Sequence, residues 1–132
     1  REVAERYTRV FGSDERFQTP VELDYGTSAW HLYVLRLNRL PGLDRNSFVD
    51  ELKERNIGFS VHYRPLHMMS YYRDKYGFTP DQFPVAKDAY ERMVSLPLHP
   101  RLTEEDVSDV ISTVLEVADE QMAAPSGGQL AR

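Results

Sequence analysis

The chain has 132 residues, of which 41% are hydrophobic and 28% are charged, with a formal net charge of -5 and no cysteine. This composition is typical of one globular domain with a single core, and it excludes a disulfide framework, a thiolate metal site and a mainly disordered chain. No apolar run approaches the roughly 20 residues of a membrane-spanning helix, so we expect no membrane partner. The lack of cysteine is consistent with a cytoplasmic location.

The negative charge is concentrated near the C-terminus. The acidic residues between positions 102 and 131 have no lysine or arginine among them, which indicates the solvated face of a helix. No basic stripe accompanies the aromatic residues elsewhere, so we expect no nucleic-acid partner.

Residues 1–11 are expected to form the first helix, because apolar residues recur there at helical spacing: Val3, Tyr7, Val10 and Phe11. Gly12 gives this helix a natural end. No Ser, Thr, Asp or Asn precedes it as a cap. We interpret this abrupt start as the end of a longer helix in a parent chain.

After an extended segment near residues 20–24, residues 28–38 are expected to form a strand. One face would carry Trp30, Leu32 and Val34, and the other His31, Tyr33, Leu35 and Leu37. Both faces are largely apolar, so both need a cover. Helices of this short chain can cover one face, and the other requires something else. We therefore expect the isolated chain to expose an apolar patch and to associate with itself or to swap elements between copies.

A second helix is expected over residues 46–55, capped by Asp44 or Asn46. Asn56 would close it in the left-handed conformation. Its inward residues would be Phe48, Val49 and Leu52. Residues 57–63 then alternate as a half-buried strand that ends at Pro65.

The remaining segments are mainly helical. Residues 66–77 are aromatic and helical in their middle, and residues 84–93 form a further helix with Pro84 in its first turn. Residues 96–98 are expected to be an edge strand, because Pro97 cannot donate to a ladder. The last helix begins with a capping box of Thr103 and Asp106. Its apolar stripe is Val107, Val110, Ile111, Val114, Leu115 and Ala118. From Ala123 onward the residues have nothing to bury and predict a loose tail.

These elements predict an α+β fold, with a small, mainly antiparallel sheet of three to four strands and helices packed on one face. A strictly parallel β/α arrangement is the competing interpretation, but the strands are few and one of them carries proline.

Groups that could perform chemistry are sparse. The histidines are His31, His62, His67 and His99, and their spacing fits no zinc site, so we expect no metal. No GxSxG motif indicates a serine nucleophile, and no glycine-rich loop indicates a phosphate site. The densest cluster, residues 59–78, combines aromatic rings and cations that suit a polar, ring-shaped ligand. The competing interpretation is that half of these residues are core and the rest ordinary surface.

Three strings resemble, in this order and spacing, the C-terminal domain of the DegT/StrS family of sugar aminotransferases: SAWHLYVLRL (28–37), GFSVHYRPLH (58–67) and SLPLHPRLTEEDVSDVI (95–111). The string RNSFVDELKERNIG and the pair Phe83-Pro84 resemble linking elements of the same family. The resemblance extends to about Ala118. Asn56 departs from it, because the family usually has glycine there.

The resemblance implies a fold-type-I enzyme whose large domain, absent from this chain, holds pyridoxal phosphate on a lysine. Residues 1–12 would be the end of the interdomain helix, 13–121 the small domain and 122–132 a flexible tail. The intact homodimer would move an amino group from glutamate to a nucleotide-linked keto sugar, for surface-glycan, lipopolysaccharide or antibiotic-sugar biosynthesis. The lysines of this chain, which stand on polar helix faces or turns, are Lys53, Lys75 and Lys87. We therefore expect no catalytic residue in the chain and no activity from it alone.

The resemblance also implies ligand contacts for this chain. His31 would face the cofactor, and His62, Tyr63 and His67 would bind the nucleotide sugar. Arg36 is a candidate anchor for the carboxylate of glutamate, although we favour a structural ion pair for it. Two alternatives stay open: a family member that has lost transamination, such as a sugar dehydratase or a regulatory protein, and a non-enzymatic ligand-binding or dimerisation module.

Overall fold

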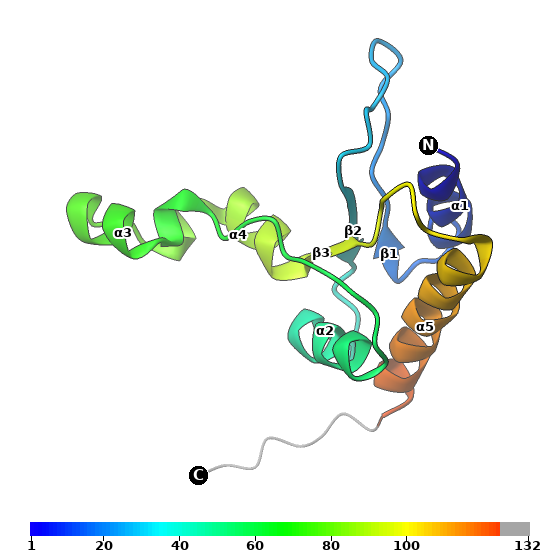
Figure 1. The fold of residues 1–132 in the computed structure, drawn as a ribbon. Coiled ribbons are helices and arrows are strands. Elements are labelled where there is room, and N and C mark those ends of the chain that lie inside the picture. Colours follow the sequence, from blue (N-terminus) through cyan, green and yellow to red (C-terminus); the bar gives the residue numbers. More distant parts are fainter. Residues whose placement is uncertain (125–132) are drawn as a thin grey trace.

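The structure, a computed structural model, describes residues 1–124, and residues 125–132 lie outside it. Its helices and strands follow one another as α1 (Glu2–Phe11), β1 (Phe17–Gln18), β2 (Tyr33–Leu37), α2 (Arg45–Glu54), α3 (Ser70–Tyr76), α4 (Pro84–Arg92), β3 (Met93–Leu96) and α5 (Glu104–Ala123). The strands form one antiparallel sheet in the order β1-β2-β3 (Figure 1). The predicted α+β class with a mainly antiparallel sheet is confirmed.

One face of the sheet is buried against the helices. Along β2 the buried residues alternate with half-buried ones, so Tyr33, Leu35 and Leu37 lie on the covered face. The register places Leu96 opposite Tyr33, Val94 opposite Leu35 and Phe17 opposite Leu37. Because paired residues point to the same side of a sheet, these six residues form a continuous apolar layer.

Helix α1 covers this layer through residues spaced one helical turn apart. Ala4, Tyr7 and Phe11 are fully buried. The Tyr7 ring lies 5.1 Å from the Tyr33 ring in an edge-on arrangement, and the Tyr7 hydroxyl donates to the carbonyl of Pro97 at 3.0 Å. Burial raises the pKa of Tyr7 to about 12. The first helix is therefore part of the same core as the sheet.

Helix α5 completes the covering layer, and its start is the one predicted. The Thr103 hydroxyl accepts from the Asp106 N–H, and the Asp106 carboxylate accepts from the Thr103 N–H. The buried stripe is Val107, Val110, Val114, Val117 and Ala118, with Ile111 and Leu115 only partly buried. The helix runs through Ala123, so the loose tail does not begin at residue 122; the rest of that tail lies outside the described residues.

Helix α2 has the predicted ends. The Asp44 side chain accepts from the Ser47 N–H at 2.8 Å, and Asn56 has φ of +60°. Its inward residues Phe48, Val49 and Leu52 are buried as predicted. Local capping chemistry therefore sets both ends of this helix.

The predicted strands differ from the observed ones at their boundaries. The strand predicted for residues 28–38 begins only at Tyr33, because Trp30 has φ of +52° and interrupts the extended backbone. The strand predicted over residues 96–98 is displaced to Met93–Leu96, so Pro97 follows it.

The strand predicted for residues 57–63 is reduced to one isolated bridge between Ser60 and Ser95. Hydrogen-bonded pairs recur every second residue in an antiparallel ladder, so the next such pair on one side would be Gly58 with Pro97. Proline has no N–H to donate there. The pairing therefore stops after one bridge on that side.

Two segments project from the core in different directions (Figure 1). One is the connection between β1 and β2. The other, here called the arm, comprises residues 63–92 and carries α3 and α4, neither of which has a buried residue. Large apolar side chains that are exposed in the described part of the chain fall in these two segments, except Met122: Val21, Leu23, Tyr25, Tyr63, Leu66, Met69, Tyr71, Tyr76, Phe83 and Val85. No helix within residues 1–124 is long and apolar enough to cross a membrane.

Because the core is buried and the arm is exposed, we expect the same leucine-to-alanine substitution to lower the free energy of unfolding by different amounts in the two regions. Leu52 is fully buried, whereas Leu66 of the arm is 59% exposed. We expect Leu52→Ala to lower the free energy of unfolding by about 2–5 kcal/mol, because it leaves a cavity. Leu66→Ala, the matched control, should change it by less than about 0.5 kcal/mol. Urea denaturation followed by circular dichroism measures both, and equal losses would contradict this division.

Candidate functional site

His31 lies at the root of the β1–β2 connection, two residues before β2 begins. Its side chain is exposed. The preceding Trp30 stacks on Tyr33 with 5.8 Å between ring centroids. Since the strand starts only at Tyr33, the alternation that placed His31 on the face of Tyr33 and Leu35 does not extend to it. His31 is therefore open to a partner and is not part of the core.

His62 lies where the arm leaves the core, and one of its ring nitrogens is anchored. Nδ1 lies 3.0 Å from the hydroxyl oxygen of Ser95, which is only 4% exposed. The backbone of Ser95 both donates to and accepts from Ser60, at 2.7 and 3.1 Å. This bridge holds the 60–62 segment against β3 and leaves the Ser95 hydroxyl for His62. The other nitrogen, Nε2, makes no hydrogen bond within residues 1–124.

Tyr63 and His67 have opposite surroundings. Tyr63 is 68% exposed, with its ring edge-on to His62 at 4.7 Å. His67, in the 3-10 helix Leu66–Met68, is only 7% exposed, and its ring lies 4.5 Å from that of Phe83. Its Nε2 is buried and has no hydrogen-bond partner in the described part of the chain. A buried nitrogen in that state favours any arrangement that supplies a partner.

Within the described residues, contact among the four predicted ligand residues is limited to the chain neighbours His62 and Tyr63. His62 and Tyr63 touch each other at the base of the arm, and His67 lies further along it. Among the described residues, no hydrogen bond or ring contact joins His31 to the other three. Sequence reasoning missed Ser95, because its role depends on a bridge between segments far apart in the chain.

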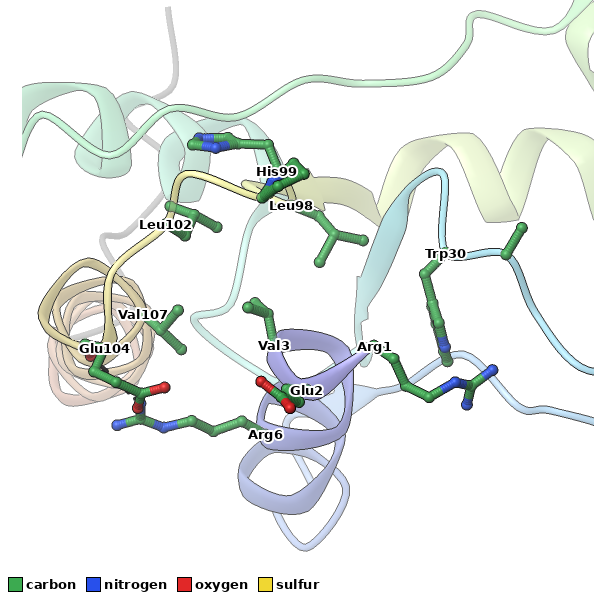
Figure 2. Close-up of a pocket in the computed structure, with 12 residues that line it drawn as sticks. Arg1, Glu2, Val3, Arg6, Trp30, Leu98, His99, Leu102, Glu104 and Val107 are labelled. Carbon is green, nitrogen blue, oxygen red and sulfur yellow. Dashed lines mark hydrogen bonds and ion pairs between the residues drawn. The ribbon is translucent and has the colours of Figure 1, made fainter.

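A separate pocket of about 540 Å³ lies between α1, Trp30 and the start of α5 (Figure 2). Val3 of α1 and Val107 of α5 supply part of its apolar lining. Figure 2 shows the Trp30 side chain extending from its loop towards Arg1. Its indole nitrogen is buried and lacks a partner within residues 1–124. None of the four predicted ligand residues lines this pocket.

The lysines do not fit an imine with pyridoxal phosphate. Such a lysine must be available as a neutral amine, which desolvation favours. Lys87 lies 2.6 Å from Asp81, whose hydrogen bond and charge raise the pKa of the Lys87 ammonium. Lys75 donates to the Tyr71 hydroxyl at 2.9 Å, and Lys53 is exposed in the last turn of α2. The surroundings of these lysines therefore do not favour the neutral amine that an imine requires.

Comparison with known sequences places the chain among aminotransferases. The model of the DegT/DnrJ/EryC1/StrS aminotransferase family matches residues 1–115. The chain is 41% identical over 121 residues to an uncharacterized protein of Methanocaldococcus jannaschii. The aligned region covers 90% of this chain and 31% of that protein. It is also 41% identical over 118 residues to the spore coat polysaccharide biosynthesis protein SpsC of Bacillus subtilis, covering 88% of this chain and 30% of that protein. The chain thus spans about three tenths of the length of these relatives.

Solved structures share the fold. The putative sugar aminotransferase Spr1654 of Streptococcus pneumoniae, in its apo form, has a TM-score of 0.78 at 30% identity, covering 92% of this chain and 30% of that one. PseC of Helicobacter pylori, an aminotransferase involved in the biosynthesis of pseudoaminic acid, has a TM-score of 0.81 at 27% identity, covering 90% of this chain and 32% of that one.

The contact between His62 and Ser95 predicts an energetic coupling. In a double-mutant cycle with His62→Ala and Ser95→Ala, we expect a coupling of about 0.5–1.5 kcal/mol in the free energy of unfolding, because each variant removes the same hydrogen bond. Ser112→Ala on the exposed surface of α5 is the matched control, and with His62→Ala it should be additive within about 0.5 kcal/mol. Urea denaturation of the variants measures both. Additivity of the first pair would contradict a stabilising contact between these two side chains.

Proposed function

This chain belongs to the DegT/DnrJ/EryC1/StrS aminotransferase family, and from that premise we propose that it is the C-terminal part of a pyridoxal-phosphate-dependent sugar aminotransferase. The family match over residues 1–115 is the observation that carries this proposal. Solved forms of Spr1654 are described as a PLP form and a PMP form, and SpsC is a polysaccharide biosynthesis protein. These relatives support pyridoxal phosphate as the cofactor and a sugar as the substrate.

We further propose glutamate as the amino donor and a nucleotide-linked keto sugar as the acceptor, in a cytoplasmic homodimer. The chain spans about three tenths of its relatives' length, and its lysines are exposed or held by other side chains. The imine-forming lysine would then belong to a large domain outside this sequence. On this proposal the 132-residue chain alone does not catalyse transamination.

In the proposed enzyme, residues in and next to the two projecting segments of this chain would contact the cofactor and the substrate. His31, open at the root of the β1–β2 connection, would contact the cofactor. His62 and Tyr63 would bind the nucleotide sugar at the base of the arm. His67 would contribute through the buried Nε2 that lacks a partner within residues 1–124. The apolar side chains of the arm would be covered by the large domain or by the second subunit.

The position of the lysine can be tested in the protein encoded by the whole open reading frame that contains this chain. We expect an imine absorbance band, its loss on borohydride treatment, and attachment of the reduced cofactor to a lysine outside these 132 residues. The triple variant with Lys53, Lys75 and Lys87 changed to arginine should keep both band and trapping. Mass spectrometry of the reduced protein locates the modified residue.

Attachment at one of these lysines, or an open reading frame that begins at this chain, would contradict the proposal. Trapping without amino-group transfer from glutamate to a nucleotide-linked keto sugar would favour a family member with another reaction. Absence of any imine band would favour a sugar dehydratase, a regulatory homologue or a binding module.

The contact proposed for His31 predicts a kinetic effect in the same intact protein. We expect His31→Ala to lower kcat/KM by about 10- to 100-fold, the loss of one hydrogen bond to a charged group. His99→Ala is the matched control, because His99 is also exposed and its side chain accepts only from the Arg101 N–H within residues 1–124. Steady-state kinetics at a fixed glutamate concentration measures both. Equal kcat/KM for wild type and His31→Ala would remove His31 from the site.

A further inference from the structure

The second face of the sheet, here called the open face, carries the residues that alternate with the buried layer. On β2 these are Val34 and Arg36, both half-buried. The register places Ser95 opposite Val34, and Met93 and Gln18 on either side of Arg36. Paired residues point to the same side, so these five residues share the open face. None of them is acidic.

Arg36 stands out on this face because its charge has no partner. The sequence favoured a structural ion pair for it, and that prediction is wrong: within residues 1–124, no carboxylate lies within ion-pair distance of its guanidinium. Other half-buried arginines of the described chain pair with a carboxylate: Arg6 with Glu104, Arg16 with Asp14, Arg55 with Glu120 and Arg92 with Asp88. Arg45 is half-buried without a carboxylate partner too, but its guanidinium lies over the Tyr90 ring, 5.2 Å from the centroid. Within residues 1–124, Arg36 is the half-buried arginine whose guanidinium has neither a carboxylate nor an aromatic ring beside it.

The unpaired charge of the half-buried Arg36 side chain is unfavourable. A guanidinium carries a delocalised positive charge, and partial burial leaves that charge without an opposite one beside it. Partial removal from water weakens the solvation of that charge, and an anion restores it best when it accepts two parallel N–H bonds. Carboxylate and phosphate groups have the geometry for this.

A pocket lies beside this arginine. It has a volume of about 280 Å³ and is lined by Gln18, Thr19, Pro20, Val21, Val34 and Arg36. Its only charged lining residue is Arg36, while Gln18 adds an amide donor. The size suits one small anionic group and not a whole nucleotide.

We propose that Arg36 anchors an oxyanion subsite on the open face of the sheet, where it binds the carboxylate or phosphate group of a small ligand. The subsite follows from the geometry of this chain and does not depend on the proposed function. It lies on the same face as Ser95, which anchors His62. A ligand held by Arg36 would thus lie along the sheet face that leads to the base of the arm.

Binding is tested on the 132-residue chain with inorganic phosphate and with glutarate, each titrated at constant ionic strength. The readout is the side-chain Nε–H resonance of Arg36 in ¹H–¹⁵N spectra, which also report whether each variant is folded. We expect saturable shifts at millimolar concentrations. In Arg36→Gln the anion is followed at neighbouring backbone amides, and we expect no saturable shift there or a Kd that is at least about tenfold higher. This is the effect of losing a hydrogen bond to a charged group. Arg36→Lys should give intermediate binding, because it keeps the charge but not the fork of donors.

Arg9→Gln is the matched control, because Arg9 is exposed on α1 and has no ion pair in the described part of the chain. It should bind both anions as the wild type does. Saturation by phosphate alone would identify a phosphate subsite, and saturation by glutarate alone a carboxylate subsite. The proposal is overturned if neither anion gives a saturable response, or if folded Arg36→Gln responds as the wild type does.

Discussion

The fold depends on the packing of one side of β2 against α1 and α5. Tyr33, Leu35 and Leu37 commit that side to the core, and Tyr7 fixes α1 to it through the Tyr33 ring. Because strand residues alternate, the same packing turns Val34 and Arg36 to the other side. The helices leave that side uncovered. The residues that we propose as ligand contacts lie on the open face, in the two projecting segments or where the arm leaves the core.

Sequence was a good guide where the determinants are local. The stripe of α5, the capping box of Thr103 and Asp106, the Asp44 cap and the left-handed Asn56 all act within a few residues, and the structure confirms them. Strand boundaries depend on remote partners and were less accurate. Trp30 interrupts the first predicted strand, and the strand over residues 57–63 shrinks to one bridge because its next partner is Pro97.

The site was predicted only as a set of residues, since the contacts within it join segments far apart in sequence. Nothing near His62 indicates that a buried serine more than thirty residues away would anchor its ring. The same limit applies to Arg36: an apolar strand with one arginine suggests an ion pair, but whether a carboxylate reaches it depends on which elements cover that face. The hydrophobic periodicity of the sequence also did not predict that His31 is exposed or that His67 is buried.

The register also relates the two projecting segments to each other. Ser95, which anchors His62, lies opposite Val34, and Val34 follows His31 by only three residues. Three residues span at most roughly 10 Å even when fully extended, so both histidines lie near the same end of the sheet although they stand at the bases of different projections. A site that uses both must therefore form over that end, next to the open face. That position leaves it uncovered by the helices of this chain, which is consistent with the exposure of His31 and Tyr63 beside a complete core.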